Sequence, residues 1–133
     1  MKGIADTGFV VAFLNRRDIY HQWASSLAQQ VSEPLLTCDA VLAEAAFHVQ
    51  DCGLVLNLVQ EGLLLPAFNV KESTTQLREL ARRYKDRSPD LADLCLIRLS
   101  ELNPRHHVIT VDIEDFKVYR RNRRESIPLL FPQ

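Results

Sequence analysis

Residues 2–15 read Lys-Gly-Ile-Ala-Asp-Thr-Gly-Phe-Val-Val-Ala-Phe-Leu-Asn, and this stretch decides the fold. A short apolar run ends on the carboxylate of Asp6, the small residues Thr7 and Gly8 follow, and an apolar segment comes next. The pattern predicts a buried strand that carries Asp6 at its carboxyl end, followed by a helix. Ligand sites in open α/β sheets lie at the carboxyl ends of strands. Asp6 is therefore either a functional carboxylate or a simple helix cap, and the stretch alone favours neither.

The composition of the chain is that of an ordinary globular domain. Its 133 residues are 47% hydrophobic and 25% charged, so we expect one domain over residues 1–133. The net charge of −1 means that any contact with nucleic acid must come from a local basic patch. The three cysteines form no CxxC motif, and we find no signal peptide and no apolar run long enough for a bilayer. These features predict a cytoplasmic protein with reduced thiols and no membrane segment.

Apolar runs and amphipathic segments alternate along the rest of the chain. Strands are expected at residues 4–6, 35–37, 63–70, 107–111 and 127–131. Helices are expected at residues 8–14, 19–31, 39–50, 54–61, 72–86, 88–102 and 113–119. Asp18 and Ser88 are expected to cap the second and sixth helices, and Gly62 to follow the fourth. The alternation predicts an α/β fold with a largely parallel sheet and helices on both faces.

Four carboxylates fall at related places in this arrangement. Two of them end strands and two lie in the first turns of helices: Asp6, Asp112, Glu44 and Asp93. The carboxyl ends of parallel strands and the starts of the following helices share one rim of the sheet, so we expect the four side chains to converge. Asp90 lies three residues before Asp93, and Asp115 three residues after Asp112. Both are expected in an auxiliary role.

Clustered carboxylates repel one another and need compensation at neutral pH. A divalent cation supplies it, and a ligand set made only of oxygens suits Mg²⁺ or Mn²⁺ rather than zinc. Metals held in this way carry out phosphodiester chemistry, in which one ion activates water and a second stabilises the leaving oxygen. The alternative is that the acids are separate helix caps and surface groups. It suits Asp39, Asp90 and Asp115 better than the strand-ending Asp6 and Asp112.

Other catalytic motifs are missing or incomplete. The DTG triplet at residues 6–8 matches aspartic proteases, but their chemistry needs a second matching aspartate and the chain has no other DTG. No phosphate-binding loop, GxGxxG motif or GxSxG nucleophile elbow is present. A Mg²⁺ phosphatase or phosphoacceptor domain needs a partner lysine, or a second acid two residues after the nucleophile. Thr7 and Gly8 follow Asp6 instead, and no lysine ends a later strand.

Four short segments together point to a known family. They read IADTG at residues 4–8, LAEAA at 42–46, DLADL at 90–94, and VITVD at 108–112, which runs into Asp115-Phe116. Each segment is weakly specific, but the ordered set at this spacing is specific. In these features the chain resembles PIN domains, and more narrowly the VapC-type ribonuclease toxins of bacterial toxin–antitoxin pairs. Leu94-Cys95 departs from the small residues that the family more often has there.

The resemblance implies a three-layer α/β/α sandwich and a Mg²⁺-dependent endoribonuclease, in which Mn²⁺ can substitute. Asp6, Glu44, Asp93 and Asp112 would hold the metal and carry catalysis, and the reaction would be hydrolysis of RNA by a metal-activated water. Thr110 would match a small hydroxyl residue that often precedes the last acid by two positions. Asp93 ranks first as the third acid because it precedes an apolar run, and Asp90 could share that role. Such toxins also imply an antitoxin partner and a homodimer. The alternative function is a catalytically silent PIN-like module that binds RNA or protein, and the presence of all four acids argues against it.

A dense basic run follows the last of these acids. It consists of Lys117, Arg120, Arg121, Arg123 and Arg124. Such a run can hold RNA phosphates beside the acidic rim. It can equally be a solvated turn, and the sequence leaves both interpretations open.

Overall fold

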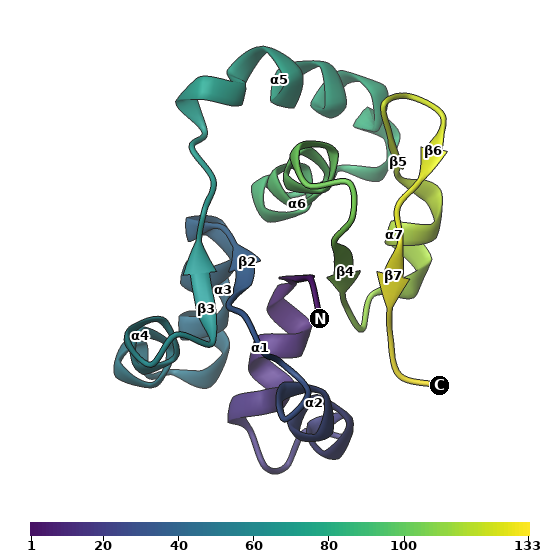
Figure 1. Cartoon of the computed structure of the whole chain (residues 1–133). Coiled ribbons are helices and arrows are strands. Elements are labelled where there is room, and N and C mark those ends of the chain that lie inside the picture. The colour runs from purple at the N-terminus through teal and green to yellow at the C-terminus, as the bar shows by residue number, and fades with distance from the viewer.

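The computed structural model describes residues 1–133 and is built on a five-stranded sheet (Figure 1). The strands are β1 (Gly3–Ala5), β2 (Leu35–Thr37), β3 (Leu64–Pro66), β4 (His107–Ile109) and β7 (Leu129–Leu130). Their order is β3-β2-β1-β4-β7, and every neighbouring pair is parallel. The α/β class with a parallel sheet is thereby confirmed. β1 occupies the centre of the sheet, so Asp6 leaves the sheet at its middle.

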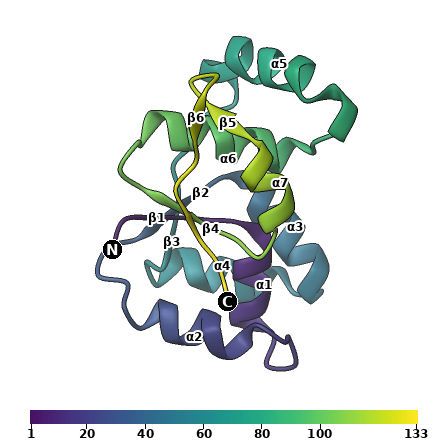
Figure 2. The same ribbon diagram turned by 90° about the vertical axis from the view of Figure 1, so that its right-hand side faces the viewer.

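All seven expected helices are present. They are α1 (Thr7–Leu14), α2 (His21–Ala28), α3 (Asp39–Val49), α4 (Cys52–Gln60), α5 (Thr74–Arg83), α6 (Leu91–Leu102) and α7 (Ile113–Val118), with short 3₁₀ turns η1 (Lys71–Ser73) and η2 (Lys85–Arg87). Figures 1 and 2 show α1 and α2 on one side of the sheet and α5 and α6 on the other. None of the helices combines the length and the apolar character that crossing a bilayer requires.

The ends of several elements differ from the sequence prediction. α2 begins at His21 rather than Ile19, because Asp18 accepts a hydrogen bond from the Tyr20 amide within a turn and does not cap the helix. β3 is confined to Leu64–Pro66 instead of residues 63–70; a proline lacks the N–H needed to continue a ladder. Gly62 follows α4 with a φ of +88°, the left-handed conformation expected there.

The start of α6 also differs from the prediction. Ser88 was expected to cap this helix, but Asp90 does so by accepting a hydrogen bond from the Asp93 amide at 2.8 Å. Ser88 has a φ of +48° and ends the preceding 3₁₀ turn. Asp90 and Asp93 are therefore linked within one turn, with the carboxylate of Asp93 free of the cap.

The core explains why the strands are continuous apolar runs. Helices cover both faces of the sheet, so Ile4, Leu35, Val108 and Ile109 are all fully buried. α6 is the most deeply packed helix and lies between the sheet and α5 (Figure 1). An acid in its first turn is therefore carried by a rigid element.

Gly8 allows the turn between β1 and α1 to lie against the end of the neighbouring strand. A Cβ at this position would sit 2.3 Å from Cγ2 of Val111. Any larger residue would have to displace the Val111 side chain, so glycine suits this close approach. Because Val111 directly precedes Asp112, the contact brings the two strand-ending acids, Asp6 and Asp112, to the same part of the rim.

Candidate metal centre

The four predicted acids meet around one open pocket of about 520 Å³ at the carboxyl edge of the sheet. Asp6 follows β1, Glu44 projects from α3, Asp93 lies in the first turn of α6, and Asp112 caps α7. Asp90 lines the same pocket. Residues far apart in the sequence are thus placed together by the parallel topology, as the sequence analysis predicted.

Asp6 is held by hydrogen bonds to both of its carboxylate oxygens. Oδ1 accepts from the Thr7 amide at 2.6 Å, and Oδ2 accepts from the Thr110 hydroxyl at 2.6 Å. The oxygen of Thr110 in turn accepts from the Asp112 amide at 2.9 Å. Thr110 therefore connects the first and last acids, which gives a structural reason for a hydroxyl residue at this position.

Glu44 is positioned by Thr7, a residue that the sequence analysis treated only as part of a turn. The Thr7 hydroxyl donates to Glu44 Oε1 at 2.9 Å. Thr7 thus contacts Asp6 with its amide and Glu44 with its side chain. Its place directly after Asp6, in the strand-to-helix turn, is the signal that could have identified it.

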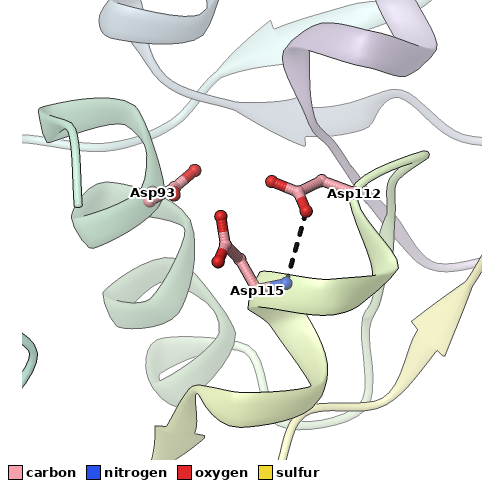
Figure 3. A group of neighbouring side chains, drawn as sticks. All are labelled: Asp93, Asp112 and Asp115. Atoms are coloured by element: carbon pink, nitrogen blue, oxygen red, sulfur yellow. Dashed lines mark hydrogen bonds between the residues drawn. The ribbon is translucent and has the colours of Figure 1, made fainter. Parts of the chain in front are cut away.

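Three carboxylates form the tightest group in the pocket region. One oxygen from each of Asp93, Asp112 and Asp115 lies within 4.8 Å of the others, and Figure 3 shows the three side chains pointing toward one another from α6 and the start of α7. Asp112 also accepts from the Asp115 amide at 3.3 Å. Asp115, which the sequence placed in an auxiliary role, is therefore as close to Asp93 and Asp112 as a metal ligand would be. Of the two candidates for the third acid, Asp93 is the one in this group.

Burial raises the pKa values of the acids around the pocket. It raises the pKa of Asp6 to about 6 and that of Asp93 to about 7. Neighbouring carboxylates add to both effects, while the hydrogen bonds to Asp6 from Thr110 and to Asp93 from Tyr119 act in the opposite direction. The pKa values of Glu44 and Asp112 are raised as well, again mainly by burial.

No lysine or arginine compensates this negative charge at the four predicted acids; burial raises the pKa of Glu44, and the neighbouring His48 offsets that rise only in part. None of the four acids forms a salt bridge, whereas Asp115 pairs with Arg87 at 2.6 Å. Four clustered carboxylates with raised pKa values and no lysine or arginine partner are groups that a bound divalent cation would stabilise. The four acids offer only carboxylate oxygens, which fit Mg²⁺ or Mn²⁺.

Lys117 of the predicted RNA-binding run lies in the last turn of α7, and the four arginines fall in a hairpin formed by β5 (Arg120–Arg121) and β6 (Glu125–Ser126). Arg121 is a correction to the prediction: it is only 5% exposed and donates to Ser100 and Glu125, so it is not free for an RNA phosphate. Arg120 donates to the carbonyl of Lys117 and so covers the end of α7.

The remaining basic residues of the run lie outside the protein interior. Arg123 pairs with Glu79, while Lys117 lies over the ring of Phe131 at 5.6 Å. Arg124 is exposed and forms no ion pair. The hairpin follows the end of α7 opposite to Asp112, so these residues lie beyond the acidic pocket and do not line it.

Two more residues at the site could not be identified from the sequence. The Tyr119 hydroxyl donates to Asp93 Oδ2 at 2.9 Å, and the Arg87 guanidinium contacts Asp115. The partners in these contacts are 26 and 28 positions apart, and the contacts depend on how α7 packs against α6 and η2. His48 lines the pocket one helical turn after Glu44.

A comparison with known protein families matches residues 4–122, which is most of the chain, to the PIN domain. The matched range contains every acid that lines the pocket. A search of curated proteins returned no match.

Proposed function

The chain belongs to the PIN domain family, a family of nucleases, and we propose that it is a Mg²⁺-dependent endoribonuclease that hydrolyses RNA phosphodiester bonds. One observation carries the proposal: Asp6, Glu44, Asp93 and Asp112 come from four different elements and meet in one pocket, and no lysine or arginine pairs with any of them. Asp6 and Asp112 also cap α1 and α7, but a cap alone does not explain why four acids gather in one place. Buried carboxylates are normally paired with a cation. Carboxylates without a lysine or arginine partner at the carboxyl edge of a parallel sheet match the place and chemistry of a metal-dependent active site.

The residues of the chain have distinct roles in this proposal. Thr7 and Thr110 fix the two oxygens of Asp6, and Thr7 also fixes Glu44, so the first two ligands are oriented before a cation arrives. Asp93 and Asp112 complete the ligand set, with Asp115 beside them. A divalent cation bound here would lower the pKa of a water molecule and stabilise charge on the scissile phosphate. The openness of the pocket leaves room for a backbone segment of single-stranded RNA.

Contacts with RNA outside the pocket are proposed for the exposed basic residues only. Lys117 and Arg124 remain candidates for phosphate contact, with Arg123 available if it exchanges Glu79 for a phosphate. Arg121 is excluded because its guanidinium group is buried against Ser100 and Glu125. Arg120 stays a candidate through the part of its guanidinium group that does not contact the end of α7.

The experiment that tests the nuclease proposal compares three proteins on a panel of structured and single-stranded RNAs, with Mg²⁺ and with a chelator. Wild type should cleave only with Mg²⁺, and Asp6→Asn should abolish cleavage while the protein stays folded. Asp86→Asn is the matched control, because it makes the same replacement of aspartate by asparagine at an exposed residue outside the pocket. Cleavage by Asp6→Asn at the rate of wild type would rule out the proposed active site.

We further propose that this nuclease is the VapC-type toxin of a toxin–antitoxin pair, that a cognate antitoxin inhibits it and that it acts as a homodimer. The support is the resemblance of the four acid-bearing segments to such toxins. Expression in a bacterial host should stop growth for wild type but not for Asp6→Asn, and co-expression of a small protein encoded beside it should restore growth. Normal growth with active wild-type nuclease would contradict the toxin assignment while leaving the nuclease assignment intact.

A further inference from the structure

We propose that Tyr119 is a positioning residue of the candidate metal centre and fixes the orientation of the Asp93 carboxylate. The inference rests on the proposed function, because Asp93 needs a fixed orientation only if it is a ligand. The Tyr119 hydroxyl donates to Asp93 Oδ2 at 2.9 Å. This contact joins the residue directly after α7 to the first turn of α6.

The ring of Tyr119 is fixed by its surroundings. It is only 1% exposed and is packed edge-on by two other rings, with centroid distances of 5.3 Å to Phe116 and 5.0 Å to Tyr84. The Tyr84 hydroxyl takes no part in the contact with Asp93: it accepts a hydrogen bond from the Arg120 amide at 2.7 Å. The donor offered to Asp93 is therefore in place before any ligand binds.

Asp93 needs such a donor because its other neighbours repel it. The charges of Asp90, Asp6 and Asp112 all act on its carboxylate. The side chain is only partly buried, so without a partner it could turn away from them toward solvent. A carboxylate oxygen that accepts one hydrogen bond keeps lone-pair capacity for a cation. Tyr119 can therefore orient Asp93 without competing with the metal.

α7 thereby organises one wall of the site from both of its ends. Asp112 caps its start and Asp115 lies in its first turn, while Tyr119 at its end reaches across to α6. Residues that orient metal ligands in this way typically contribute about 10- to 100-fold to metal affinity or activity. We expect an effect at the lower end of this range, because Tyr119 contacts one of several ligands.

The test measures Mn²⁺ binding to the purified full-length chain by calorimetry and by the electron paramagnetic resonance of free Mn²⁺. Tyr119→Phe should weaken Mn²⁺ binding by about tenfold, since it removes only the donor and keeps the ring. Tyr84→Phe is the matched control: it removes a hydroxyl from the same aromatic cluster, but one that contacts the main chain. It should leave Mn²⁺ affinity unchanged, and both variants should keep the circular dichroism spectrum of wild type.

The possible outcomes separate this inference from the proposed function. Equal Mn²⁺ affinity of Tyr119→Phe and wild type would overturn the role of Tyr119 and leave the metal centre standing. Equal loss in Tyr84→Phe and Tyr119→Phe would also overturn it, because the aromatic cluster would then act only through the fold. If wild type itself binds no Mn²⁺, the metal centre and the inference both fall. In cleavage assays Tyr119→Phe should need more Mg²⁺ for half-maximal rate but approach wild type at saturating Mg²⁺.

Discussion

Asp6→Asn should stabilise the metal-free protein at neutral pH although it removes an acid at the centre of the proposed active site. The buried carboxyl group of Asp6 has its pKa raised from 3.8 to about 6, so ionising it costs more in the folded protein than in the unfolded chain. A tenfold change in proton affinity corresponds to about 1.4 kcal/mol, and the ionised Asp6 therefore lowers the free energy of unfolding by about 3 kcal/mol.

The direction of the pH dependence follows from the raised pKa. Between about pH 3.8 and pH 6 the folded protein binds more protons at Asp6 than the unfolded chain does, so this contribution to stability is present at low pH and lost as the pH rises. Asparagine does not ionise, so it avoids this cost. It can accept only part of the hydrogen bonding from Thr7 and Thr110, which costs about 1 kcal/mol. The net gain of Asp6→Asn should be about 2 kcal/mol above pH 7, and below pH 4 it should turn into a net loss of about 1 kcal/mol.

Urea denaturation with a chelator present, at several pH values between about pH 4 and pH 8, measures this effect directly. The difference in free energy of unfolding between Asp6→Asn and wild type should grow with pH, and Mg²⁺ should stabilise wild type alone, most strongly at the higher pH values. If the two curves run parallel over the whole range, the ionised Asp6 carries no folding cost and the reasoning is refuted.

Three further perturbations test separate parts of the structure. Gly8→Ala should lower the free energy of unfolding by about 1–3 kcal/mol in urea, because the new Cβ would lie 2.3 Å from Val111; an unchanged midpoint would contradict the close approach. Arg87→Gln removes the cation paired with Asp115 and should strengthen Mg²⁺ binding by about two- to fivefold in low-salt calorimetry, whereas weaker binding would show that Arg87 supports the site. Arg124→Ala, in a cleavage-deficient background, should weaken binding of a labelled RNA and reduce the slope of log affinity against log salt concentration by about 1. An unchanged slope would show that Arg124 does not contact the RNA.

The sequence alone was sufficient to predict the parallel sheet and the convergence of the acids at one of its edges. A central parallel strand is apolar throughout because both of its faces are covered, so Ile4-Ala5 and Val108-Ile109 could be recognised as strands. The carboxyl ends of parallel strands share one edge whatever the details of packing. Asp6 and Asp112 could therefore be placed together without knowing any contact between them.

The parts that the sequence did not predict depend on contacts between distant segments. Arg121 belongs to a run that looks solvated, but Ser100 on α6 and Glu125 across the hairpin draw its guanidinium inward. The positions of Tyr119 and Asp115 follow from how α7 packs against α6. The periodicity of apolar residues identifies the buried face of a helix, but it does not identify the residues that this face packs against.

Local chemistry explains the other differences. Ser88 and Asp90 are both good capping residues three positions or fewer from the helix, and the sequence alone could not choose between them. Asp90 caps α6 because Ser88 takes a left-handed conformation at the end of η2. This choice matters for the site, since it occupies an oxygen of Asp90 with the Asp93 amide and leaves Asp93 as the acid facing Asp112.

The most direct test of the metal centre is the anomalous scattering of Mn²⁺ in crystals of the wild-type chain grown or soaked with this ion. We predict a peak in the pocket within coordination distance of carboxylate oxygens from Asp6, Asp93 or Asp112. We also predict that the peak disappears in crystals of Asp6→Asn treated in the same way. A pocket without anomalous density at Mn²⁺ concentrations that support cleavage, or a peak bound elsewhere on the chain, would contradict the claim that these acids form the metal centre.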